Sequence, residues 1–143
     1  MSTPVTLPDL PGFGDEPELT AVARFHNLIG DLADHRRMAG GAAASPFGRA
    51  HAAGWVAGTE ATLGAASAAI SAHRSMRAPS GQRHTALRGR LVAATRLSRQ
   101  PGDVLRRVSE AGFLAGACAT YRALMALADA RIGEAAEQAV IPR

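Results

Sequence analysis

The positions of the prolines place the strongest limit on the fold of this 143-residue chain. Proline fixes its own backbone dihedral and has no amide donor, so it breaks helix interiors and central strands. Four of the eight prolines fall within the first 17 residues, and the others are spread widely, at positions 46, 79, 101 and 142. The segments between them carry apolar residues at helical spacing and no alternating β-branched run bounded by turn residues. The sequence therefore predicts an all-α protein.

Capping and breaking residues divide the chain into four helices. Asp15 is expected to cap the first helix, and Ser45 and Asp103 the two long ones. We expect helices over residues 15–40, 45–76, 82–99 and 103–139. The predicted fold is a four-helix bundle of two hairpins, each a short helix followed by a long one, in a single domain over residues 17–143. Residues 1–16, rich in proline and glycine, are expected to form an extended N-terminal arm.

The two long helices contain related segments. Residues 53–63 and 111–121 are identical at six of eleven positions at a constant offset of 58. Alanine-rich helices can match by chance, but glycine costs a helix interior roughly 1 kcal/mol relative to alanine. Recurring glycine pairs therefore indicate a close contact between helix backbones that offsets this cost. The predicted packing seams are Gly54, Trp55, Gly58, Gly112, Phe113 and Gly116, with Ala53, Ala57 and Ala61 assigned to the same stripe as the first glycine pair.

A second seam on the last helix alternates steps of four and three residues, as a coiled-coil seam does. It consists of Leu114, Cys118, Tyr121, Met125, Ala128 and Ile132. One seam can face the core of the bundle while the other is available to a neighbour, although both can also be internal. Cys118 is expected to be an inert core thiol, and Trp55 a packing anchor or an interface residue.

Positive charge is concentrated in one part of the chain. Residues 73–107 hold nine arginines and one acid, a net charge of +8, whereas the whole chain carries +4, so the remainder sums to −4. On the third predicted helix, Arg88, Arg96 and Arg99 fall within about 80° of one another. Such a stripe suits a phosphate backbone or an acidic protein partner, and a solvated face is the simplest alternative. The candidate binding residues are Arg74, Arg77, Arg83, Arg88, Arg90, Arg96, Arg99, Arg106 and Arg107.

The residues for catalysis or cofactor binding are sparse. One cysteine excludes a disulfide framework, and the histidines and acids lack the spacing of a metal site, so we expect no metal, no cofactor and no small-molecule substrate. Charged residues interrupt each apolar run, so no membrane span or secretion signal is expected, and a cytoplasmic protein or virion component is predicted. Arg77 and His84 resemble the R-x6-H motif of HEPN ribonucleases, although here the motif spans a Pro-Ser-Gly turn. That resemblance implies RNase activity as an alternative to a non-enzymatic role.

The predicted function is that of a non-enzymatic helical subunit in a larger viral or nucleoprotein assembly. The small-residue seams and the N-terminal arm would provide its packing contacts with copies of itself or other subunits. The alternative is a small nucleic-acid-binding protein that contacts DNA or RNA backbone through the arginines of residues 73–107.

Overall fold

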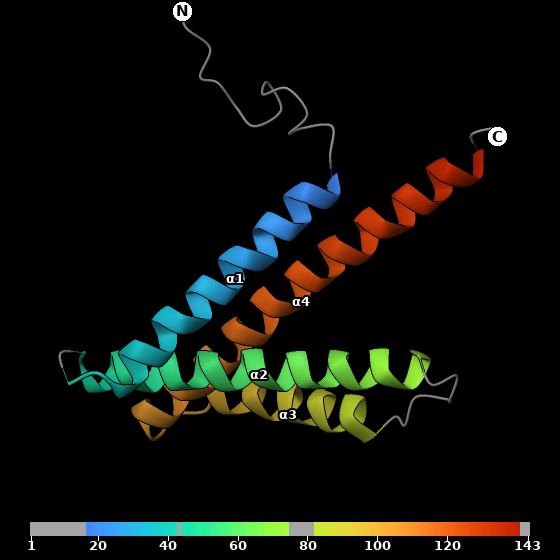
Figure 1. Ribbon diagram of the computed structural model, residues 1–143. Helices are drawn as coiled ribbons and strands as arrows, with labels where there is room; N and C mark the ends of the chain where they lie inside the picture. The colour runs from blue at the N-terminus through green and yellow to red at the C-terminus, as the bar shows by residue number, and fades with distance from the viewer. Residues whose placement is uncertain (1–16, 43, 75–81, 141–143) are drawn as a thin grey trace, which may run out of the picture. The chain divides into compact units, whose positions relative to one another are not determined.

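The computed structural model describes residues 17–42, 44–74 and 82–140 (Figure 1). In this part of the chain it contains four helices and no strand. The helices are α1 (Pro17–Gly40), α2 (Pro46–Arg74), α3 (Gln82–Arg99) and α4 (Val104–Val140). The predicted all-α class and helical bundle are confirmed, with every described helix end within two residues of its expected position. The predicted arm and the Asp15 cap lie outside the described residues.

Both long helices begin at the predicted caps. The Ser45 hydroxyl oxygen accepts a hydrogen bond from the Gly48 amide at 3.0 Å. The Asp103 carboxylate accepts from the amides of Leu105 at 3.0 Å and Arg106 at 3.4 Å. These bonds satisfy amides that have no partner inside the helix. Gly102 precedes the second cap with a φ of 137°, a conformation that L side chains rarely adopt, and so allows the short turn between α3 and α4.

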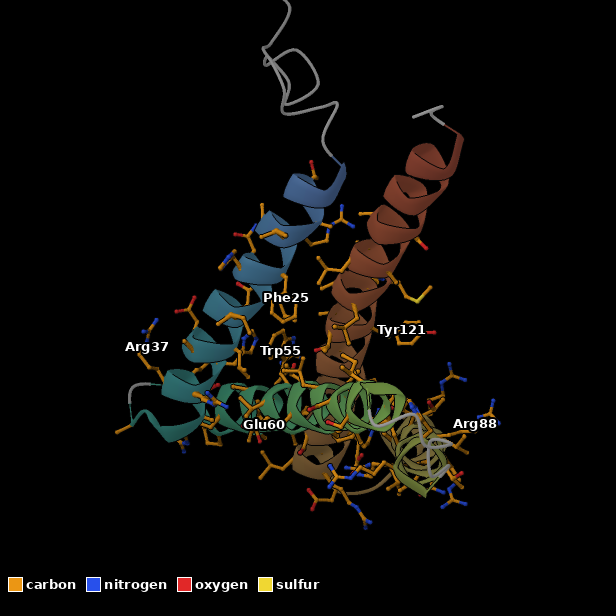
Figure 2. All side chains as sticks on the ribbon, turned by 45° about the vertical axis from the view of Figure 1, so that its right-hand side comes forward. Phe25, Arg37, Trp55, Glu60, Arg88 and Tyr121 are labelled. Atoms are coloured by element: carbon orange, nitrogen blue, oxygen red, sulfur yellow. The ribbon has the colours of Figure 1, made fainter. Side chains whose placement is uncertain are left out.

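The described helices group into two compact units, and the prediction of one domain over residues 17–143 remains a prediction. The smaller unit combines α1 up to Ile29 with α4 from Arg122 onward. Ala21, Leu28 and Ala123 are buried there. Figure 2 shows Phe25 pointing from α1 toward α4.

The larger unit runs from Gly30 to Tyr121 and holds the end of α1, all of α2 and α3, and the beginning of α4. Helix α3 lies alongside α2 (Figure 1). The core consists mostly of small side chains around two aromatic rings, Trp55 and Phe113. The other buried residues of this unit's core include Ala52, Thr59, Thr62, Ala65, Ala94, Ala117 and Thr120. Small core residues allow helix axes to approach closely, and the glycines described next make the closest approach.

Candidate functional site

Helices α2 and α4 meet backbone to backbone at four glycines. A methyl group on Gly58 would lie 2.9 Å from the carbonyl carbon of Phe113 and closer still to its oxygen. On the opposite helix, a methyl group on Gly116 would lie 2.8 Å from the carbonyl carbon of Trp55. Gly54 and Gly112 make the same kind of contact. No residue with a Cβ atom fits these four positions without moving a helix, so the glycine pairs identified in the sequence are required by the helix crossing.

The four contacts are reciprocal across the repeat. Gly54 faces the carbonyl of Ser109, and Gly112 faces the carbonyl of His51. Gly112 lies 58 residues after Gly54, and Ser109 lies 58 residues after His51. The contacts of Gly58 with Phe113 and of Gly116 with Trp55 are related by the same offset. Residue numbers rise together on the two helices, so they cross in the parallel sense. The α2–α4 pair therefore has local pseudo-twofold symmetry, in which equivalent residues make equivalent contacts.

Three threonine hydroxyls bind backbone carbonyls at the crossing. Thr62 donates to the carbonyl of Gly58 at 2.9 Å, and its equivalent, Thr120, donates to the carbonyl of Gly116 at 2.7 Å. Thr59 also donates to the Gly116 carbonyl, at 3.2 Å, and this bond joins the two helices. The residue equivalent to Thr59 is Ala117, so the third bond has no counterpart in the repeat. All three hydroxyls are buried and satisfied, as a close-packed interior requires.

A side chain from a short helix covers each of the two equivalent aromatic rings. The His35 ring stacks on Trp55 with centroids 4.0 Å apart and planes 7° from parallel. The Arg90 guanidinium lies 4.1 Å from the centroid of Phe113. Both rings are buried, Trp55 at 6% exposure and Phe113 at 4%. The two covering residues could not be identified from the sequence, because a contact between successive helices leaves no spacing signal within either helix.

Arg90 also forms an ion pair with Glu110, a second contact missed from the sequence. Its two terminal nitrogens donate to the two carboxylate oxygens, at 2.6 Å and 3.2 Å. The Glu110 side chain is 11% exposed. This bidentate pair joins α3 to α4, so the guanidinium of Arg90 is already bound to a carboxylate of the same chain.

The exposed surfaces of the long helices differ from expectation in two respects. The alanines assigned to the packing stripe, Ala53, Ala57 and Ala61, are exposed, because the glycines beside them face the neighbouring helix and these alanines do not. The expectation that Cys118 is a core thiol is wrong, since this residue is exposed. Its neighbour in the second seam, Tyr121, is 61% exposed. In the larger unit, the glycine seam of α4 is thus internal, and the Cys118–Tyr121 part of its second seam faces outward.

The arginines of α3 form an exposed face. Arg88, Arg96 and Arg99 are exposed on the side of the helix opposite buried Ala94. Figure 2 shows Arg88 pointing away from α2. We call these three residues, together with exposed Val92 between them, the arginine face. Helix α3 contains no acidic residue.

The acidic residues nearest to the arginine face in sequence already have partners within the protein. Asp103 caps α4, and Glu110 binds Arg90. Among the described residues, the three arginines of the face and Arg106 and Arg107 at the start of α4 have no ion pair. The face therefore combines a high local positive charge with guanidinium groups that are free to bind an anion.

The remaining candidate arginines have other environments. Arg90 is committed to Glu110, and a terminal nitrogen of Arg83 lies near Gly64 of α2. Arg77 lies outside the described residues, and for Arg74 the structure describes only the backbone. Of the two residues of the R-x6-H motif, the structure therefore describes only His84, which is exposed. Within the described ranges, no group of three or more His, Cys, Asp or Glu side chains could hold a metal ion.

One stretch of α4, Val104–Ala130, is long and apolar enough to cross a membrane, which the sequence analysis did not expect. Between Ala111 and Ala128 it contains one charged residue, Arg122. A helix packed within a bundle meets the same criterion of length and composition. Here Gly112 and Gly116 of the stretch contact α2, and 33% of its apolar window is buried.

The protein is therefore an all-α helical bundle with an internal glycine crossing and an exposed arginine face. In comparisons with known proteins, no family model, curated protein or solved structure matches the chain.

Proposed function

We propose that the protein is a non-enzymatic helical subunit of a larger assembly and associates with copies of itself. The supporting observation is the use of the two seams on α4. The glycine seam is fully occupied by α2, whereas the second seam presents Cys118 and Tyr121 outward. Large apolar or aromatic side chains at coiled-coil spacing on an exposed helix face are typical of a surface that pairs with another helix.

Tyr121→Glu is expected to weaken this association, because it places a charge at the centre of the seam and removes an aromatic contact. Size-exclusion chromatography with light scattering and native mass spectrometry would measure the oligomeric state of the full chain. Ala115→Glu is the matched control, since Ala115 is exposed on the same helix about 120° away. A wild-type protein that stays monomeric at tens of micromolar would contradict the proposed function.

The second candidate function is binding to a nucleic-acid backbone. It is favoured by an acid-free α3 whose exposed arginines have no ion pair in the described structure. The arginine face carries no aromatic side chain on which bases could stack, so contact with phosphates fits better than recognition of single strands.

Arg88→Ala/Arg96→Ala should weaken binding to all duplex sequences similarly. The slope of log K against log salt concentration should fall in magnitude by about 2, because each phosphate contact contributes roughly 0.9 to that slope. Electrophoretic shift with duplex DNA, single-stranded DNA and RNA at two salt concentrations would measure this. Arg24→Ala/Arg122→Ala removes the same charge from exposed arginines outside the face and should have a smaller effect. Absence of any shift at low salt would eliminate this candidate.

A further inference from the structure

The arginine face and its surroundings contain apolar side chains that a phosphate backbone would not use. Val92 is 65% exposed and lies one helical turn from both Arg88 and Arg96. Just beyond the turn that follows α3, Val104 and Leu105 are 50% and 43% exposed. A surface of this composition fits an extended peptide with both acidic and apolar side chains, because such a peptide can use both kinds of group.

The chain itself contains a segment of that composition. Residues 1–16 include three acids and no arginine or lysine, and their larger apolar residues are interspersed with the acids. The acids are Asp9, Asp15 and Glu16, and the larger apolar residues are Val5, Leu7, Leu10 and Phe13. The segment thus has the opposite charge to the arginine face and matching apolar groups. Sixteen residues can span at most about 55 Å, which exceeds the roughly 27 Å length of the 18-residue α3.

We propose that residues 1–16 of one copy dock on the arginine face of a second copy. The inference rests on the proposed assembly function and adds a second contact between subunits to that of the Cys118–Tyr121 seam. Each chain then donates one segment and accepts another, a heterologous arrangement that forms rings or extended chains. Exposed ion pairs between a segment and a helix are individually weak, so the contact should be sensitive to salt.

A charge-exchange experiment on the full chain tests this contact. Arg88→Glu/Arg96→Glu reverses the face, and Asp9→Arg/Glu16→Arg reverses the segment while retaining the predicted cap Asp15. Each variant alone juxtaposes like charges, so its self-association should be at least about tenfold weaker than that of the wild type. An equimolar mixture should recover association, because the basic segment of one variant meets the acidic face of the other. Native mass spectrometry would identify the mixed species by mass.

The controls separate this contact from other effects. Arg24→Glu/Arg37→Glu makes the same change in net charge at exposed positions of α1, outside both the face and the Cys118–Tyr121 seam, and should leave association within about twofold of the wild type. Circular dichroism should show unchanged helix content in the face variant, since both of its arginines are exposed and unpaired. A synthetic peptide of residues 1–16 should compete with wild-type association but have no effect on the residual association of the face variant.

Each contrary outcome has a distinct meaning. If the wild type associates but the reversals do not alter its association, the segment–face contact is overturned and the proposed assembly function stands. If the wild type is monomeric, both fail. If the two variants lose association and their mixture does not recover it, the contact between chains is overturned. If the face variant loses duplex DNA binding while its association is unchanged, the face is occupied by nucleic acid and the inference fails.

Discussion

Gly58→Ala and Gly116→Ala are each expected to lower the free energy of unfolding by about 2 kcal/mol, the upper end of the balance between overpacking and improved helix propensity. A methyl group at either position overlaps a backbone carbonyl of the opposite helix, and a backbone cannot move aside as a flexible side chain can. Overpacking of a core by a single group typically costs 1–3 kcal/mol, and here it outweighs the roughly 1 kcal/mol that alanine returns as a better helix former. Thermal melts should show a fall in Tm of roughly 8 °C for each variant.

Two other helical glycines provide matched controls with the opposite sign. Gly30 in α1 and Gly89 in α3 have nothing within 4 Å of the position that a Cβ atom would occupy. Gly30→Ala and Gly89→Ala should therefore stabilise the protein by up to about 1 kcal/mol. If all four alanine variants raised Tm, the close backbone contact between α2 and α4 would be refuted.

Arg90→Ala is expected to produce a comparable loss, of about 2–3 kcal/mol. It leaves the nearly buried Glu110 carboxylate without its two hydrogen bonds and removes the cation from the face of Phe113. Breaking a buried pair by deleting one partner typically costs 3–5 kcal/mol, and the partial exposure of Arg90 reduces this value. Urea denaturation followed by circular dichroism would give the difference.

Arg88→Ala is the control for that measurement, because Arg88 lies two residues earlier on the same helix and is exposed without an ion pair. Its effect should stay within about 0.5 kcal/mol. Arg90→Ala/Glu110→Ala should be less destabilising than Arg90→Ala alone, since the second change removes the unpaired carboxylate. Equal losses for the two single arginine variants would show that the Arg90–Glu110 pair contributes nothing specific.

The sequence predicts the helices well because their ends depend on local chemistry. Ser45, Asp103 and Gly102 act within three or four residues of their own positions, so their effects can be identified without knowledge of the fold. The glycine crossing could also be anticipated, since a costly residue type recurs at fixed spacing in two segments. The prediction of which small residues face the neighbouring helix was less accurate. Alanine and glycine are both small, and the sequence alone did not show that the alanines point outward.

Contacts between different helices were much less accessible from the sequence. His35 and Arg90 cover equivalent aromatic rings, but they do so from α1 and α3, and neither has a characteristic spacing to its partner. Arg90 was grouped with the other arginines because charge density does not distinguish a guanidinium bound to a carboxylate from a free one. Cys118 was misassigned for a related reason: an apolar seam has the same periodicity whether it faces the core or the outside.

The parallel crossing of α2 and α4 has a consequence for how the chain folds. Helices that run in the same direction cannot be joined by a tight turn, so the chain returns through α3, alongside α2, before α4 begins. The partners at the crossing are more than fifty residues apart in sequence, and none of the glycine contacts contributes until that loop has closed. Helices and short turns form far faster than contacts of such sequence separation. We therefore expect the docking of α4 on α2 to limit the rate of folding.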